Sequence, residues 1–445
     1  MAILTYGHKE KYLTMTTENK TFCPLFFKHV ALWNGTTARP CCRYDPDANL
    51  KKRGFSKVPS DFKFTNFDNT FHSTTWKILR EESLRGIEDP GCWKCYEEEE
   101  NGIESLRLSQ INANDFDLEN PELSFLEINL GNHCNLACNI CCSDNSDKWL
   151  NDDIALKALG HHRAIFKMDN HYGFSLNKDD YKNVTIIKFV GGEPMLHPKF
   201  ISVLDFLIES NFSENISLQI FTNCSWVPKD KVLNRLAKFK SVLMSLSVDG
   251  MGSVQEYSRW GSEWDIVQES VTTWLNTSER SDGKISVRIE PTVNIYNALY
   301  MDKLLKWWMN LCENLLSDGI YCKEDNSCNI IFNPVSWPHY LSPHIIPTET
   351  KLRATQKIKT LREKFASSYT HEKLSVIRYD FLNKMEILIS SIEKEIPDET
   401  RDDLLDRFVK FSYDLDKQRN TSVYEYLPDL MSCFDEKYEY KSLQS

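Results

Sequence analysis

Three cysteines with a spacing suited to metal chemistry stand near the first third of this sequence. Cys134, Cys138 and Cys141 follow the pattern C-x3-C-x2-C, directly after an apolar run that begins at Phe125 and reads as a short buried strand. Thiolates are soft ligands, and three of them so close together can converge on an iron-sulfur cluster. Three protein ligands leave one iron of a four-iron cluster open, so the site predicts a cluster that binds a small molecule.

A second group of cysteines lies upstream, between Thr21 and about Glu100, and consists of Cys23, Cys41, Cys42, Cys92 and Cys95. The pair Cys92-Trp-Lys-Cys95 has C-x2-C spacing. Such a pair, together with two remote thiols, can close a four-thiolate site for zinc or for an iron-sulfur cluster, and spacing does not distinguish these metals. The other cysteines are scattered, and we expect them to be small buried residues. They are Cys224, Cys312, Cys322, Cys328 and Cys433.

Composition limits the class of protein. The 445 residues are 41% hydrophobic, which is enough for two or three domains with a sizeable core. The net charge of -11 disfavours binding to nucleic-acid phosphates, and no apolar run is long enough to cross a bilayer or to serve as a signal peptide. We therefore expect a cytoplasmic protein without membrane or nucleic-acid partners, whose thiols stay reduced for metal binding or catalysis.

The elements that must position these residues alternate along the chain. From about Phe125, short β-rich runs are followed by stretches of helical periodicity, which is typical of a parallel sheet with crossover helices. The expected strands are 125–130, 184–190, 217–222, 242–248, 285–293 and 329–333. The expected helices are 146–159, 198–209, 228–239, 264–275 and 298–316. This pattern predicts an α/β fold with a partial, TIM-like (β/α)6 barrel, open on one side, with its chemistry on loops that leave the carboxyl ends of the strands.

The expected barrel occupies residues 120–340 and is flanked on both sides. An N-terminal extension, 1–20, precedes a small Cys-rich module, 21–105, with a turn at Trp33-Asn-Gly35 and a short helix at 74–84. After the barrel, residues 345–445 are expected to form a helical C-terminal region, with amphipathic stretches at 374–393 and 401–415.

A strand followed by C-x3-C-x2-C resembles the defining loop of the radical S-adenosylmethionine (SAM) superfamily. The resemblance implies that Cys134, Cys138 and Cys141 hold a catalytic 4Fe-4S cluster, whose fourth iron is chelated by the amino and carboxylate groups of SAM. Ile140 occupies a position that is usually aromatic in that family, and an aliphatic side chain there can still pack on adenine. Cys142 is an extra thiol, expected to remain uncoordinated, with a ligand swap as the alternative.

The ends of the second and third expected strands also resemble motifs of this family. Gly191-Gly192-Glu193 resembles the GGE motif of the family, which receives the ammonium group of SAM through backbone and carboxylate. Two glycines allow a close backbone approach that a side chain would block. Thr222-Asn223 is similar to the TNG element near the ribose and methionine of SAM, although a cysteine replaces the usual glycine.

The fourth and fifth expected strands complete the set. Ser245-Leu-Ser247-Val-Asp249-Gly with Arg259 downstream resembles the S-x-D-G strand and arginine of the peptide-modifying branch, which implies that Ser247 and Arg259 hold the carboxylate of SAM. For Arg259, a surface salt bridge is the alternative. Ile289 resembles the strand residue that contacts adenine.

The upstream cysteines, in the order C…NG…PCC…W…C-x2-C, resemble a SPASM or twitch domain, the auxiliary-cluster module of many radical SAM enzymes. In those enzymes it usually follows the barrel, whereas here it comes first. The resemblance implies a second 4Fe-4S cluster, with zinc as the alternative metal. Its ligands would be Cys23, Cys41, Cys92 and Cys95, with Cys42 as the alternative to Cys41.

These resemblances imply a radical SAM enzyme, either an oxidoreductase or a peptide-modifying enzyme. A 5'-deoxyadenosyl radical from reductive cleavage of SAM would abstract hydrogen from a peptide or protein, or alternatively from a sugar or aminocyclitol. An electron donor such as flavodoxin or ferredoxin would be a partner. A hypothesis of another class is a non-catalytic zinc-binding interaction protein, which leaves the GGE and S-x-D-G elements unexplained.

Overall fold

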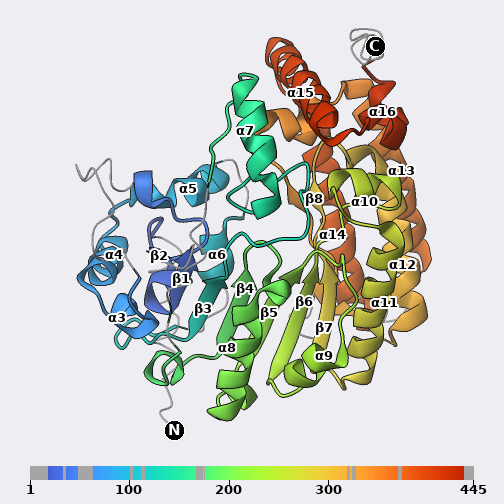
Figure 1. Ribbon diagram of the computed structural model, residues 1–445. Coiled ribbons are helices and arrows are strands. Elements are labelled where there is room, and N and C mark those ends of the chain that lie inside the picture. Colours follow the sequence, from blue (N-terminus) through green and yellow to red (C-terminus); the bar gives the residue numbers. More distant parts are fainter. Residues whose placement is uncertain are drawn as a thin grey trace. The chain divides into compact units, whose positions relative to one another are not determined.

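The chain divides into two compact units in the computed structural model (Figure 1). The structure describes residues 19–33, 37–48, 64–100, 104–111, 116–166, 174, 176–317, 321–322, 327–368 and 373–434. Most of the expected N-terminal extension and of the Trp33-Asn-Gly35 turn lies outside these residues. The first unit comprises Met1–Gly131, Asp169–Gly191 and Ser202–Leu218, and the second comprises Asn132–Met168, Gly192–Ile201 and Gln219–Ser445.

The first unit contains four strands in the order β2-β1-β3-β4. Their bounds are β1 (His29–Trp33), β2 (Thr37–Arg39), β3 (Phe125–Asn129) and β4 (Ile186–Val190). Strand β3 pairs in parallel with both β1 and β4, with His29 opposite Phe125, and β2 is antiparallel to β1. The upstream segment therefore contributes two strands that the sequence pattern did not indicate, because both are shorter than the windows that reveal a period.

Short helices accompany these strands in the first unit, and they are α3 (Phe67–Phe71), α4 (Thr74–Leu84), α5 (Trp93–Glu100) and α6 (Leu106–Ile111). Helix α4 has the bounds that the sequence predicts. Ser73 caps it by accepting the Trp76 N–H, and a side-chain oxygen at this position satisfies a helix donor that would otherwise have no partner. The Trp76 indole is buried and donates to the His29 carbonyl at 3.3 Å, which joins α4 to β1.

Two elements have residues in both units and match their expected bounds, namely α8 (Pro198–Glu209) and β5 (Ser217–Thr222). The second unit also contains β6 (Ser241–Leu246) and β7 (Ile285–Ile289), which are parallel, with Val242 opposite Ile285. Its helices before the C-terminal region are α7 (Leu150–Ala158), α9 (Asp230–Leu236), α10 (Ser253–Ser258), α11 (Trp264–Arg280) and α12 (Met301–Leu315).

The last two expected strands are shorter than predicted. The strand expected at 285–293 ends at Ile289 and resumes as β8 (Thr292–Val293), because Pro291 between them has no N–H for a ladder. The strand expected at 329–333 is reduced to a parallel bridge between Ile330 and Ile289 and to β11 (Asn333–Pro334), which pairs in parallel with β8. A two-stranded antiparallel ribbon, β9 (Tyr321–Cys322) and β10 (Ser327–Cys328), lies between α12 and β11 in sequence.

The predicted α/β class with a predominantly parallel sheet is confirmed, and the strands that the structure describes form no closed barrel. The helical C-terminal region is also confirmed. It consists of α13 (Thr348–Ser368), α14 (Lys373–Glu393), α15 (Asp398–Arg419), α16 (Val423–Tyr426) and α17 (Pro428–Met431). Helix α15 packs against α7 (Figure 1). Within the described part of the chain, no helix is both long and apolar enough to span a membrane.

The burial of a histidine in the turn before this helical region predicts a pH dependence. Desolvation of His344, together with the nearby cations Lys394 and Lys351, lowers its pKa to about 4. An unfolded histidine has a pKa of about 6.5, so the unfolded state binds the proton first as the pH falls. Stability is therefore expected to decline between about pH 6.5 and about pH 4, by up to about 3 kcal/mol.

Urea unfolding of wild type and His344→Gln near neutral pH and again at about pH 5 checks this expectation. The variant should lose less stability on acidification, because it no longer offers this proton-binding difference. Part of the dependence should remain, since burial also lowers the pKa values of His29 and His197 to about 4. An identical pH dependence in both proteins would contradict the prediction.

Candidate cofactor site

The three cysteines of the C-x3-C-x2-C pattern lie together in the second unit, on the loop that follows β3. The Cys138 and Cys141 thiols hydrogen-bond each other, which lowers the pKa of Cys138 and raises that of Cys141. Burial raises the pKa of Cys134 to about 12. Leu136 and Ile140 pack against the three sulfur-bearing residues and shield the loop from water. We call the segment from Asn132 to Cys142 the cysteine loop.

The cysteine loop is held in its middle by the end of α10 and the segment that follows it. The Ala137 N–H donates to the Trp260 carbonyl at 2.9 Å, and the Asn139 N–H donates to the Ser258 carbonyl at 2.8 Å. Arg259, one of the predicted SAM contacts, lies between these two acceptors in sequence. The backbone thus brings Arg259 to the cysteine loop, an arrangement that motif matching alone does not specify.

The double glycine packs directly on backbone atoms that flank or belong to the cysteine loop. Gly191 has a φ of +118°, and a Cβ built on it would lie 2.5 Å from the Gly131 carbonyl oxygen. A Cβ on Gly192 would lie 2.3 Å from the His133 carbonyl oxygen, which also accepts the Glu193 N–H at 2.9 Å. The atoms that leave no room for a side chain at these two positions therefore belong to the protein's own backbone.

Replacing Gly192 with alanine is expected to force the cysteine loop to shift, because the new methyl group would overlap backbone atoms that cannot rotate away. Overpacking of this kind costs about 1–3 kcal/mol of folding free energy. Urea unfolding measures the loss. As a comparison, Gly86→Ala meets no atom within 4 Å at a φ of +75°, and should show only the conformational cost of about 1–2 kcal/mol without disturbing the loop. Wild-type stability in Gly192→Ala would contradict the prediction.

Glu193 and Asn223 form a buried polar pair beside the cysteine loop. The Asn223 N–H donates to Glu193 Oε2 at 2.7 Å, and the Asn223 amide donates to Asn135 Oδ1 at 3.0 Å and approaches the Cys134 sulfur at 3.8 Å. Burial raises the pKa of Glu193 to about 7, and the Asn223 hydrogen bond opposes this rise. Glu193 Oε1 is buried and makes no hydrogen bond of standard geometry to any described residue. A buried carboxylate oxygen in this position suits an ammonium group as its partner.

Cys224, at the position where the family motif has glycine, has a φ of +56°. This is the left-handed region, which glycine enters without strain and other residues enter at a cost. Cys224 therefore replaces the glycine of the motif but keeps the backbone conformation that a glycine would adopt there. The neighbouring Thr222 carbonyl accepts the Ser247 N–H at 2.8 Å, so two predicted SAM contacts are brought side by side.

Arg259 forms a buried ion pair with Asp249. Its Nε lies 2.9 Å from Asp249 Oδ2, and the side chains are only 10% and 0% exposed, so the surface salt bridge considered from sequence does not apply. Asp249 Oδ1 also accepts the Thr292 N–H at 2.8 Å. A buried guanidinium that is already oriented by a carboxylate is well placed to bind a second carboxylate group.

Ile289 is buried in the sheet, where its backbone pairs with Leu246 of β6 and with Ile330. It lies on the face of β7 opposite Arg288 and Glu290, since neighbouring residues of a strand alternate. That other face carries a polar cluster, in which Glu290 accepts hydrogen bonds from Ser245 at 2.6 Å and from Arg288 at 2.7 Å. Sequence reasoning did not single out this cluster, because each of its members is ordinary in its own segment.

The upstream cysteines converge in the first unit. Four of them line one small cavity, together with Arg43 and Arg107, and they are Cys23, Cys41, Cys92 and Cys95. Burial raises the pKa of each of these thiols, to about 12 for Cys23. Cys42 instead hydrogen-bonds Glu127, and burial raises its pKa to about 11. The geometry thus favours Cys41 over Cys42 as the fourth member of this group.

Two observations bear on whether these donors fit a cluster. A buried thiol is costly to ionise, because burial removes the water that would stabilise the thiolate. A bound metal centre offsets this cost by compensating the negative charge of the thiolates. Guanidinium groups of Arg259 and Arg107 also lie close enough to favour the thiolates of Cys138 and Cys23. Within the described ranges, however, no three His, Cys, Asp or Glu side chains are spaced closely enough to hold a single metal ion. The thiols therefore match the donors of an iron-sulfur cluster in their chemistry and in their grouping, and for the described residues the match does not extend to single-ion spacing.

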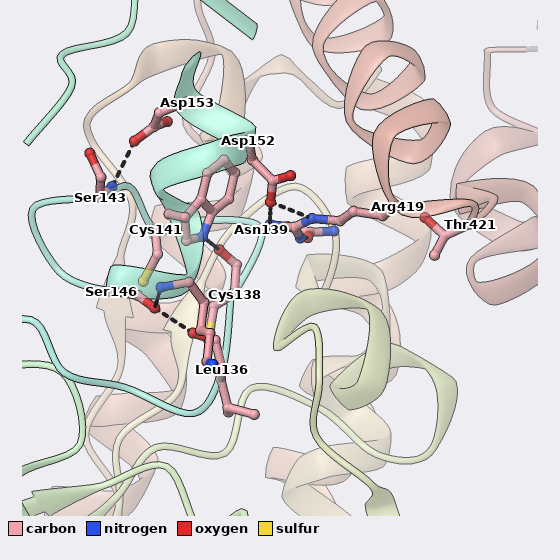
Figure 2. A network of polar contacts seen from close by, with 12 residues as sticks. Leu136, Cys138, Asn139, Cys141, Ser143, Ser146, Asp152, Asp153, Arg419 and Thr421 are labelled. Carbon is pink, nitrogen blue, oxygen red and sulfur yellow. Dashed lines mark hydrogen bonds and ion pairs between the residues drawn. The ribbon is translucent and has the colours of Figure 1, made fainter. Parts of the chain in front are cut away.

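Three further residues contact the cysteine loop but belong to none of the sequence motifs described above. Trp149 donates its indole N–H to the Cys138 carbonyl at 2.8 Å, and Arg163 donates to the Cys141 carbonyl at 2.9 Å. Arg419, from the end of α15, donates to the Asn139 side chain (Figure 2). The separation of 280 residues between Arg419 and Asn139 explains why no local signal reveals this contact.

Comparisons with known proteins find no matching family model and no matching curated protein. Among solved structures, the chain is similar to anSMEcpe with bound AdoMet and Cp18Cys peptide, at 15% identity and a TM-score of 0.33, over 55% of this chain. The chain spans only 60% of the length of that anSMEcpe structure. It is similar to Streptococcus suis SuiB bound to precursor peptide SuiA, at 14% identity and a TM-score of 0.34, over 66% of this chain and 64% of that one. It is also similar to TYW1 with a lysine-pyruvate adduct, at 14% identity and a TM-score of 0.27, over 54% and 71%.

Proposed function

We propose that this chain is a radical SAM enzyme. The observation that carries the proposal is the convergence of Cys134, Cys138 and Cys141 beside two groups that suit the polar ends of SAM. Glu193 offers a buried carboxylate oxygen that forms no standard hydrogen bond with the described residues, and Arg259 offers an oriented buried guanidinium. A set of three thiols alone is compatible with a zinc site, whereas this combination suits a ligand that bears both an ammonium and a carboxylate group.

In this proposal the following residues bind and orient SAM. Cys134, Cys138 and Cys141 hold a 4Fe-4S cluster, Glu193 accepts the ammonium group, and Ser247 and Arg259 hold the carboxylate. The remaining proposed contacts to the ribose, methionine and adenine come from Gly191, Gly192, Thr222, Asn223, Ile140 and Ile289. When bound together and supplied with one electron by the electron donor, the cluster and SAM would supply a 5'-deoxyadenosyl radical for hydrogen abstraction from a substrate, with methionine as the other product. Leu136 and Ile140, which pack with the three cysteines, would limit the access of water to such a cluster.

The upstream group is proposed to hold a second 4Fe-4S cluster. Cys23, Cys41, Cys92 and Cys95 line the same cavity, and Arg43 and Arg107 supply positive charge beside it. Such a centre would supply a one-electron acceptor or an anchoring point for the substrate. Zinc in this position would give the module a structural role instead.

The proposed substrate is a peptide or protein, with sugars and aminocyclitols as the second class. The resemblance of Ser247, Asp249 and Arg259 to the peptide-modifying branch favours the first class. A flavodoxin or ferredoxin is the proposed electron donor.

Anaerobic purification followed by iron and sulfide quantitation tests the proposal. The protein should be brown, contain both clusters, and release 5'-deoxyadenosine and methionine when supplied with SAM and dithionite. A colourless, zinc-loaded protein that leaves SAM intact would contradict the enzyme assignment and support a non-catalytic zinc-binding role.

Replacing Cys92 with alanine tests the upstream centre separately. The variant should lose about half of the iron, because one of two similar clusters is removed. It should retain part of the uncoupled SAM cleavage, since the cysteine loop belongs to the other unit. Iron content equal to wild type would contradict the assignment of Cys92, and loss of zinc instead of iron would identify the module as a zinc site.

A further inference from the structure

We propose that Arg419, the last residue of α15, is a positioning residue that clamps the cysteine loop. This inference rests on the proposed function, because it gives the C-terminal helical region a role in building the cluster site. Its direct evidence, however, is a set of contacts to the loop itself. The contacts involve Asn139 within the loop, Asp152 on α7, and Trp149 immediately before α7.

Arg419 joins the loop to α7 through charged hydrogen bonds. One end of the guanidinium donates to Asn139 Oδ1, and Asn139 stands directly after Cys138. Its Nε and the other terminal nitrogen donate to Asp152 Oδ2 at 3.0 and 2.7 Å (Figure 2). The Arg419 side chain is only 4% exposed, so water screens these interactions little. A planar guanidinium can satisfy both partners at once, whereas an ammonium group offers no such fork.

The same guanidinium lies over the Trp149 ring, with 4.5 Å between its central carbon and the ring centroid. A second guanidinium, that of Arg163, lies 4.7 Å from the same centroid. The Trp149 indole holds the Cys138 carbonyl, and Arg163 holds the Cys141 carbonyl and pairs with Asp153. The backbone at two proposed cluster ligands is therefore held by Trp149, which carries Arg419 over its ring, and by Arg163, which lies over the same ring.

The end of α15 is itself anchored, so Arg419 is presented in a fixed place. After Arg419, Asn420 adopts a left-handed conformation with a φ of 51° and ends the helix. The buried Asp416 carboxylate then accepts hydrogen bonds from Thr421, from the Val423 N–H at 2.8 Å and from the Tyr257 hydroxyl at 3.0 Å. Tyr257 belongs to α10, which leads into the segment bonded to the cysteine loop.

These contacts predict what Arg419 does for the loop. Arg419 restrains the Asn139 side chain, and the Ser258 carbonyl restrains the Asn139 backbone N–H. It also brings a fixed positive charge near thiolates that must share a cluster, and a nearby cation stabilises negative charge most strongly where water is excluded. Loss of the guanidinium should therefore loosen the loop and shift the properties of the cluster without unfolding the chain.

The metal-free protein gives the first test. Alkylation of Cys138 and Cys141 by iodoacetamide, mapped by mass spectrometry, should be about tenfold faster in Arg419→Gln than in wild type, because losing hydrogen bonds to a charged group makes local opening easier. Arg407→Gln is the matched control, since Arg407 lies on the same helix, is 54% exposed and pairs only weakly with Asp403 at 3.9 Å. Equal rates in wild type and both variants would overturn the proposal.

The cluster-loaded protein gives a second readout, because electron paramagnetic resonance of the reduced cluster reports its surroundings independently of turnover. Arg419→Gln should lose iron from the cysteine loop and show an altered resonance signal in the presence of SAM. Arg419→Lys should recover the iron content and the wild-type signal only in part. If Arg419→Gln does not fold, Asn139→Ala removes the partner on the loop and should show the same faster alkylation. A wild-type signal and wild-type alkylation in either folded variant would overturn the clamp.

The two proposals fail in different ways. If the wild-type protein assembles no cluster, the proposed function is wrong, yet faster alkylation in metal-free Arg419→Gln still supports the clamp on the loop. If the wild-type protein assembles its cluster and cleaves SAM while Arg419→Gln matches it in alkylation, iron content and spectrum, the clamp alone is wrong.

Discussion

Replacing Cys138 with alanine is expected to abolish formation of 5'-deoxyadenosine. Cys138 is the central cysteine of the loop, its thiol is hydrogen-bonded to that of Cys141, and its carbonyl is held by Trp149. A cluster that loses one of its three protein ligands would be incompletely held, because Cys134 and Cys141 are the other cysteines of the packed group around Leu136. Chromatographic detection of 5'-deoxyadenosine under reducing, anaerobic conditions measures the loss.

Two other cysteine variants serve as controls for this result. Cys142 is the next residue after the third proposed ligand, and Cys142→Ala should retain cleavage, which would exclude a ligand swap. Cys433 follows α17, donates to the Asp429 carbonyl and lies far along the chain, so Cys433→Ala should match wild type. Undiminished 5'-deoxyadenosine from Cys138→Ala would remove the ligand assignment, and loss of activity in Cys142→Ala would transfer the third ligand to that residue.

Replacing Arg259 with methionine is expected to destabilise the protein strongly and to prevent SAM binding. The substitution leaves the Asp249 carboxylate, which is fully buried, without its cation. Breaking a buried pair by removing one partner costs about 3–5 kcal/mol, because the remaining charge is no longer compensated. Urea unfolding measures the stability, and anaerobic equilibrium dialysis with the cluster loaded measures SAM binding.

A double variant separates these two consequences. Arg259→Met combined with Asp249→Asn removes the unpaired charge, while the oxygen of the new amide can still accept the Thr292 N–H, so most of the stability should return. SAM binding should remain weak, because no guanidinium is left to hold the carboxylate. Unchanged stability in the single variant would contradict the buried pair, and wild-type SAM affinity in the double variant would contradict the role of Arg259.

Local sequence patterns predicted many of the helices and strands. Helix α8 (Pro198–Glu209) and strand β5 (Ser217–Thr222) have the bounds that periodicity and turn signals predict, and so does α4 (Thr74–Leu84) in the upstream segment. These elements depend on spacings within one segment, namely a period near 3.6 for helices and a short apolar run for strands. The spacing of Cys134, Cys138 and Cys141 is equally local, which is why the sequence alone predicts the candidate cluster site.

Long-range pairing decided the rest. Strand β1 joins β3 through Val30 opposite Leu126, a pairing across a separation that no local pattern encodes. The preference for Cys41 over Cys42 depends on which way two adjacent side chains point, since one lines the cavity with Cys23 and the other reaches Glu127. Neither outcome is contained in the spacing of the cysteines.

The sequence by itself therefore determined the α/β class, most helix and strand positions between Phe125 and Leu315, and the cysteines that are candidates to ligate a cluster. Only the tertiary structure decided that Arg259 pairs with buried Asp249 and that Arg419 reaches Asn139 from the far end of the chain. The physical reason is that periodicity reflects hydrogen bonding between near neighbours, whereas these contacts arise when distant segments pack and bury their charges together.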